Sequence, residues 1–219
     1  MKYSKFKPSS KNLTLMALLS ALYASLTLIP ISPFIGGPSL LSLNLIIIPV
    51  LAYFLNPLEA FISSIIGGLA SMWLPSALSG VFGPFAILLP ICGSTLGSLY
   101  KYGVGRIIVA FYLFICIIGY LARVPQFPYW ILPHSIGLLL CIFSMLKELK
   151  RRLSFFLNAY IATMCEQSIM MILASYLLSL PAEIFAIAFP LMIYERLAAT
   201  IGGFILISIF KGIMKLQLS

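Results

Sequence analysis

The sequence predicts an all-α fold, a polytopic transmembrane bundle of six to eight helices that forms one integral membrane domain over residues 1–219. Three observations favour this class. Hydrophobic residues make up 62% of the chain and charged residues only 9%, whereas soluble domains carry about 25% charged residues. The mean hydropathy is +1.11. The apolar residues also gather in long runs that short basic segments separate, as in proteins that cross a membrane several times.

Eight apolar runs follow one another along the chain. The first, residues 13–31, comes after a basic, serine-rich start over residues 1–12. No small-residue cleavage pattern follows this run, so we expect a retained helix and not a signal peptide. The other seven runs are 40–55, 57–74, 84–100, 107–122, 129–146, 153–180 and 185–210. A helix needs about 20 residues to cross a bilayer. Runs 40–55 and 107–122 are shorter than this.

The basic residues predict how the chain is oriented. Twelve of the 14 lysines and arginines fall in four segments that lie on one side of the membrane if there are eight crossings: 1–12, 101–106, 147–152 and 211–219. Because cytoplasmic loops are enriched in lysine and arginine, we expect both termini in the cytoplasm and a multi-pass protein of the plasma membrane. Residues 107–146 form a possible extra helix pair. If two neighbouring runs form a re-entrant hairpin that does not cross the membrane, both termini still lie on the cytoplasmic side.

Several function classes are excluded by what the sequence lacks. No basic face with interleaved aromatic residues is present, so we expect no nucleic-acid partner. The chain has no aspartate, no HExxH pattern and no phosphate-binding Gly-Lys-Ser/Thr loop. We therefore expect a protein that is not an enzyme and that has neither a cofactor nor a metal site. The four cysteines lie one to a run, which is typical of buried apolar thiols; they are Cys92, Cys116, Cys141 and Cys165.

Polar side chains interrupt the last two runs. Glu166 and Gln167 lie near the middle of run 153–180, and Glu195 and Arg196 lie inside run 185–210. A charged side chain at the bilayer centre costs about 2.5–3.5 kcal/mol on insertion scales, so such residues face a protein interior or a wet cavity. Adjacent helical residues do not face each other. The expected partner of Arg196 is therefore Glu166 on the neighbouring helix.

Three interpretations of these residues remain open: a structural ion pair between the last two long helices, an outward-facing pocket for a polar or zwitterionic solute, and proton-coupled chemistry. For the pocket, the candidate lining residues are Asn44, Glu166, Gln167, Tyr194, Glu195 and Arg196. The loop at residues 30–39 has the glycine and proline content of a lid, and also that of a plain turn. Trp73 and Trp130 are candidates for interfacial anchors or for pocket-lining rings that stack on a ligand, and we favour anchoring for both. We expect His134 to make an interfacial hydrogen bond.

Small residues recur every four positions in the first run, at Ala17, Ala21 and Ser25. This spacing places them on one helical face, where another helix can approach closely. The approaching helix belongs either to this chain or to a separate protein. Similar small-residue surfaces are expected around Gly67 and around Gly97.

Three segments follow one another in a recognisable order: "LMALLSALYASLTL", "SLNLIIIPVLAYFLNPLEAFISSIIGGLAS" and "FPLMIYERLAATIGGFILISIF". Through these segments the chain resembles the substrate-capture subunits, or S-components, of energy-coupling-factor (ECF) ABC transporters. The resemblance implies capture of a vitamin or other small nutrient from outside, with a transmembrane coupling subunit and two cytoplasmic ABC ATPases as partners. In that family a stripe of alanines on the first helix docks on the coupling subunit, which implies this role for Ala17, Ala21 and Ser25. The family usually has six helices, so residues 107–146 are a surplus.

Two alternatives come from other classes. A membrane scaffold or assembly subunit would use the buried charges only to hold its helices together. A stand-alone secondary transporter would be favoured by two halves that repeat each other, and the sequence shows no convincing internal repeat.

Overall fold

The computed structural model describes residues 10–37, 40–74, 78–147 and 150–216 of the chain, and the statements below concern these residues. Most of the predicted basic start, residues 1–9, lies outside them. In the first half, the elements are α1 (Ser10–Leu26), β1 (Pro30–Pro33), β2 (Leu40–Ser42), η2 (Leu43–Ile46), α2 (Ile47–Phe54), α3 (Pro57–Ser71), α4 (Ser79–Phe82), η3 (Gly83–Ile87) and α5 (Leu88–Leu99). In the second half they are α6 (Gly103–Arg123), η4 (Pro128–Ile131), α7 (Leu132–Leu146), α8 (Arg151–Ile172), the π-helical turn η5 (Leu173–Leu177) and α9 (Ala182–Leu216).

Five helical segments are long and apolar enough to cross a membrane, which confirms a membrane-embedded helical bundle at the level of length and composition. They are Ser79–Leu99, Gly103–Arg123, Pro128–Leu146, Arg151–Leu177 and Ala182–Ile213. The possible extra pair at 107–146 supplies two of the five. Three shorter apolar helices, Asn12–Leu26, Leu43–Phe54 and Pro57–Ser71, complete the set that the eight runs predicted.

Two helices differ in extent from the predicted runs. The run at 107–122 was predicted to be short, but α6 has 21 residues because the helix starts at Gly103 and includes the polar Arg106 and Arg123. The run at 13–31 extends beyond α1, which ends at Leu26; a turn follows, and the chain becomes extended at Pro30. Pro30 disfavours helical geometry in the residue before it, so the helix does not continue to the end of the run.

The turn between α2 and α3 has the capping that its Asn-Pro sequence indicates. The Asn56 side chain accepts a hydrogen bond from the backbone N–H of Glu59 at 3.0 Å, and the Asn56 N–H donates to the Glu59 carboxylate at 3.1 Å. This reciprocal pair satisfies two backbone donors at the start of α3. Glu59 also accepts from the Asn12 side chain at 2.7 Å, so this buried carboxylate ties the start of α1 to the start of α3.

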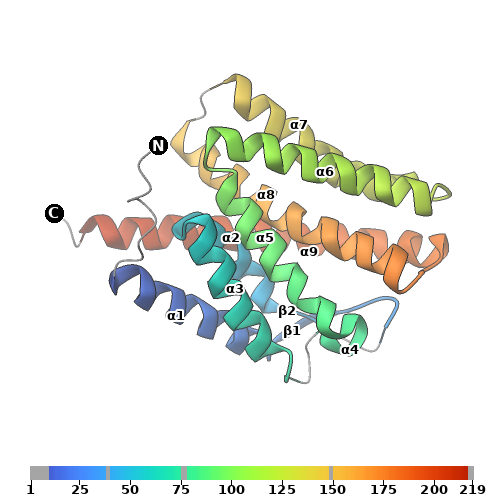
Figure 1. Cartoon of the computed structure of the whole chain (residues 1–219), viewed down its shortest axis with the longest axis horizontal. Helices are drawn as coiled ribbons and strands as arrows, with labels where there is room; N and C mark the ends of the chain where they lie inside the picture. The colour runs from blue at the N-terminus through green and yellow to red at the C-terminus, as the bar shows by residue number, and fades with distance from the viewer. Residues whose placement is uncertain (1–9, 38–39, 75–77, 148–149, 217–219) are drawn as a thin grey trace.

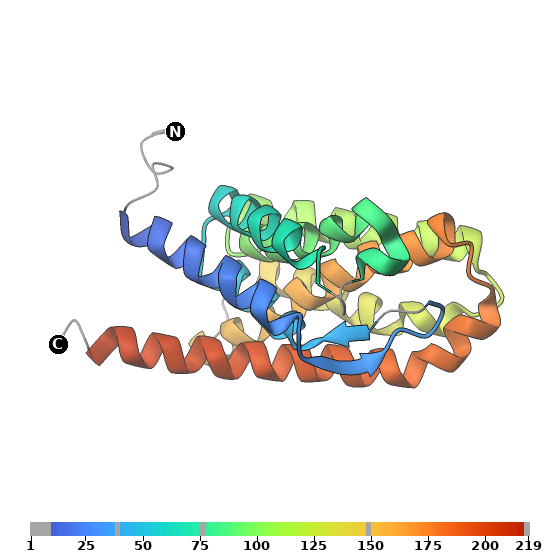
Figure 2. The same ribbon diagram turned by 90° about the horizontal axis from the view of Figure 1, so that it is seen from below.

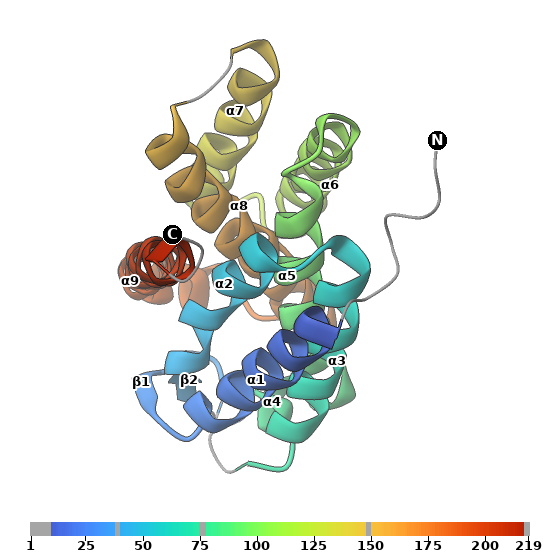
Figure 3. The same cartoon turned by 90° about the vertical axis from the view of Figure 1, so that its left-hand side faces the viewer.

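Helix α8 lies at the centre of the bundle, packed against α2, α5, α6, α7 and α9 (Figures 1 and 3). The α6–α7 pair covers one side of it, and α1 and α3 lie together on the opposite side (Figure 3). The β1–β2 hairpin lies between α1 and α9, along the length of α9 (Figure 2). The beginning of α1 and the end of α9 lie at the same end of the bundle, which we call the terminal end.

Small residues allow several of these contacts. A methyl group on Gly67 would lie 3.0 Å from the Ser20 carbonyl oxygen, and the hydroxyls of Ser20 and Ser63 are 2.7 Å apart, so α1 and α3 touch closely there. At Gly97 of α5, a methyl group would lie 2.6 Å from Cβ of Ala162 in α8. These predicted small-residue surfaces therefore serve packing within the chain.

Candidate functional site

A buried ion pair joins the two long helices α8 and α9. Nη1 of Arg196 lies 2.6 Å from Oε2 of Glu166, and the side chains are only 2% and 1% exposed. The predicted partnership of these two residues is thus confirmed. The hydroxyls of Thr163 and Thr200, 3.0 Å apart, add a second polar contact between the same helices. Nε and Nη2 of Arg196 have no hydrogen-bond partner in the described part of the chain.

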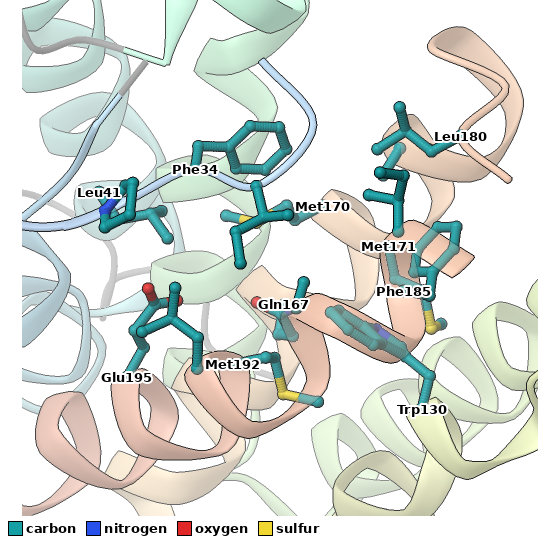
Figure 4. A pocket seen from close by; sticks show the side chains of 16 residues that line it. Phe34, Leu41, Trp130, Gln167, Met170, Met171, Leu180, Phe185, Met192 and Glu195 are labelled. Carbon is teal, nitrogen blue, oxygen red and sulfur yellow. The ribbon is translucent and has the colours of Figure 1, made fainter. Parts of the chain in front are cut away.

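A small cavity lies next to this pair, and we call it cavity A (Figure 4). Its volume is about 40 Å³. The β1–β2 loop closes it on one side, through Pro33 and Phe34. Residues of α8, η5 and the beginning of α9 form most of the remaining wall, together with Leu41 of β2 and Trp130 of η4. The wall is mainly aromatic and thioether in character; its lining includes Phe34, Leu41, Trp130, Met170, Met171, Phe185 and Met192.

Two residues that line cavity A carry polar atoms without partners in the described part of the chain. Trp130, 6% exposed, has an Nε1–H with no acceptor, and the buried Gln167 has an Oε1 with no donor. Most buried polar side-chain atoms in folded proteins have a hydrogen-bond partner, so an unpaired donor and an unpaired acceptor on one cavity indicate a place for a bound molecule. Glu195 lines the cavity too, and it accepts a short hydrogen bond from the Ser32 hydroxyl of β1. The loop is thereby attached to α9.

A second hollow, cavity B, has a volume of about 30 Å³ and lies on the other side of Leu41, which lines both cavities. Its wall is more polar than that of cavity A. Glu166 lines it together with Asn44, whose side-chain amide donates to the Thr27 hydroxyl at 2.9 Å. Tyr23 of α1 contributes an aromatic ring. The two cavities thus flank the β2 residue Leu41.

The structure brings most of the predicted site residues together. Gln167 and Glu195 line cavity A, while Asn44 and Glu166 line cavity B. Two residues differ from the prediction. Arg196 lines neither cavity, because its side chain turns into the contact with α8. Tyr194 is 60% exposed on the outer surface of α9 and does not join the site, since a neighbour of Glu195 on a helix points elsewhere.

The sequence analysis favoured the wrong role for Trp130. It was expected to anchor at the membrane interface, with pocket lining as the less favoured alternative, but it is buried against Phe185 and Phe189 and lines cavity A. Trp73, at 89% exposed, does have the exposure that an anchor needs. His134 is fully buried instead of interfacial, and its Nδ1 donates to the Trp130 carbonyl at 3.2 Å. The lining methionines gave no signal, because in an apolar run they look like any other apolar residue.

The predicted docking residues lie on the outer surface of α1. Ala17, Ala21 and Ser25 are exposed, whereas Met16 and Leu19 on the other face of α1 are buried. No helix of the described chain covers this small-residue face. The four cysteines are free; Cys92 is half-buried and the other three are buried, in agreement with their expected role as apolar thiols.

Comparison of the chain with protein-family models, with curated proteins and with solved structures found no match. The function is therefore argued from the geometry of the site itself.

Proposed function

We propose that this chain is the substrate-capture subunit of an ECF-type importer in the plasma membrane. It would bind a vitamin or another small nutrient from outside, and deliver it with a transmembrane coupling subunit and two cytoplasmic ABC ATPases. The observation that supports this proposal best is that two residues lining a cavity under the β1–β2 loop carry unpartnered groups, Trp130 Nε1–H and Gln167 Oε1. A wall made only for packing has no need of an unsatisfied donor and acceptor.

The wall of cavity A indicates the kind of solute. Aromatic rings and methionine thioethers form most of it, so the solute has a flat or apolar body. The free N–H of Trp130 requires a hydrogen-bond acceptor on the solute, and Oε1 of Gln167 requires a donor. The Glu195 carboxylate offers a further acceptor if Ser32 releases it.

The present volume of cavity A, about 40 Å³, holds only a few waters, since each needs roughly 10–15 Å³ of such volume. Pockets for small molecules measure about 300–1,000 Å³. The loop that carries Ser32 and Leu41 must therefore move when the solute binds. Because Leu41 lines both cavities, its displacement would join cavity A to cavity B and make Glu166 and Asn44 accessible to the solute.

Native mass spectrometry of the protein purified in mild detergent tests the proposal. We expect a small molecule to accompany the wild type, and Trp130→Phe and Gln167→Leu to lose it or to bind it at least about tenfold more weakly, because each leaves a polar group of the solute unpaired. Trp73→Phe is the matched control: it removes the exposed tryptophan and should retain the molecule. With only two tryptophans in the chain, this control also leaves Trp130 as a single fluorescent reporter of binding.

The scaffold interpretation has one observation in its favour: the Glu166–Arg196 pair is sealed, and Arg196 lines neither cavity. The same experiment separates the two functions. A wild-type protein that keeps its lipids but carries no small molecule, and whose Trp130 fluorescence does not respond to a panel of vitamins, would contradict capture and favour the scaffold.

A further inference from the structure

A larger hollow lies at the terminal end of the bundle, away from cavities A and B. It has a volume of about 770 Å³, and its walls are the last turns of α2 and α7, the α5–α6 turn, the beginning of α8 and the last turns of α9. We call it the basic cleft. The lining residues used below are Tyr53, Lys101, Arg106, Lys147, Asn158 and Lys211.

Four cations from distant parts of the sequence converge on this cleft: Lys101, Arg106, Lys147 and Lys211. None of the described lining residues is acidic. Like charges gathered in a cleft with low-dielectric walls produce a strong local potential that attracts an opposite charge. Such an arrangement destabilises the protein by self-repulsion unless an anion is bound.

Two of the cations are held in place by neutral groups. Nζ of Lys101 donates to the carbonyl oxygens of Tyr53 at 2.9 Å and Leu55 at 2.6 Å, at the end of α2. Arg106 donates to the carbonyls of Tyr100 and Ser144. Carbonyl groups orient the cations without cancelling their charge. Burial, together with Lys211 nearby, lowers the pKa of Lys101 to about 8, although Glu59 acts in the opposite direction.

Asn158 of α8 supplies an independent sign of a ligand. Its side chain is 2% exposed and lines the cleft, its amide nitrogen donates to the Gly97 carbonyl at 2.8 Å, and its Oδ1 has no partner. A buried carbonyl oxygen of this kind requires a donor such as a hydroxyl group.

We propose that the basic cleft binds a phosphate-bearing ligand, with the phosphate among the four cations and a hydroxyl of the ligand on Oδ1 of Asn158. An anionic lipid headgroup and a soluble phosphate ester share this chemistry. Met145 and the 82% exposed Leu146 also line the cleft, and they provide an apolar wall against which an acyl chain can pack. This proposal is independent of what binds in cavity A.

The test uses the full chain in a neutral detergent and three probes: short-chain phosphatidylglycerol, short-chain phosphatidylcholine and glycerol 1-phosphate. We expect at least one of the two anionic probes to bind more tightly than phosphatidylcholine, as measured by native mass spectrometry. The Lys147→Gln/Lys211→Gln variant should weaken that binding by about tenfold or more, since charge-assisted hydrogen bonds to phosphate are strong. In the described part of the chain neither lysine bonds to a backbone carbonyl. Lys211 donates to the Tyr53 hydroxyl at 2.9 Å, a bond that the glutamine side chain can replace, so the fold should survive.

Arg151→Gln/Arg152→Gln is the matched control, because it removes two positive charges from the same end of the bundle without touching the cleft lining. It should keep the affinity within about twofold, as expected for screened surface charges. Preference for phosphatidylglycerol over glycerol 1-phosphate would identify the ligand as a lipid, and equal affinity would identify it as a soluble phosphate ester. Equal losses in the two double variants, or no preference for either anionic probe over phosphatidylcholine, would overturn the proposal.

Discussion

Replacing Arg196 by methionine should destabilise the protein by about 3–5 kcal/mol, because it leaves the Glu166 carboxylate buried without its counter-charge. In the native structure Nη1 of Arg196 is 2.6 Å from this carboxylate, and both side chains are almost fully buried. No other described cation forms an ion pair with Glu166. Denaturant or thermal unfolding of the purified protein in detergent measures the loss.

Two further variants show whether the loss comes from the missing partner. The double variant Glu166→Met/Arg196→Met should recover most of the stability, since replacing a buried pair by apolar residues is often neutral or stabilising. Arg152→Met, at an exposed cation of α8 without a described hydrogen bond or ion pair, should change stability by no more than about 0.5 kcal/mol. If Arg196→Met is as stable as the wild type, the pair does not hold α8 to α9.

The Gly97→Leu variant should have a free energy of unfolding about 3 kcal/mol lower than the wild type, at the upper end of the usual range for an overpacked core. Even a methyl group at this position would lie 2.6 Å from Cβ of Ala162 and 2.8 Å from Cβ of Ala52, and 3.0 Å from Cα of Ala162. The last of these atoms belongs to the backbone of α8, so the contact cannot be relieved by a rotamer change. Helix α5 would have to move away from α2 and α8. The free energy of unfolding in detergent reports the effect.

Gly212 in α9 provides the matched control, since a side chain added there meets nothing within 4 Å. Gly212→Leu should be neutral or stabilise the protein by up to about 1 kcal/mol, because leucine has a higher helix propensity than glycine. A Gly97→Leu variant that unfolds like Gly212→Leu would show that α5 and α8 do not pack as closely as described.

Much of the secondary structure could be predicted because hydrophobic runs and their breaks are local signals. Asn56 and Pro57 predict the turn between α2 and α3, and a capping box forms there. The Glu166–Arg196 contact was also predictable, since adjacent helical residues cannot pair and few other buried charges exist. These inferences need only local sequence patterns and the cost of an unpaired charge in the membrane.

The inner and outer faces of the helices could not be predicted in the same way. In a lipid-embedded helix both faces are apolar, so periodicity does not separate the core from the lipid surface. Trp130 and Tyr194 were placed wrongly for this reason: the first is buried and the second exposed. The basic cleft depends on tertiary packing as well, because Lys101 and Lys211 meet only when α2, α5 and α9 converge.

The central place of α8 has a consequence for biogenesis. Among the five segments long enough to cross a membrane, it has the lowest hydropathy and is the most deeply buried. It carries Asn158, Glu166 and Gln167 in its buried surface, and polar residues at mid-membrane resist transfer from the translocon into lipid. We therefore expect α8 to leave the translocon only when α9 follows it and supplies Arg196. A truncated chain that ends before α9 should therefore stay in the translocon or be degraded by quality-control proteases.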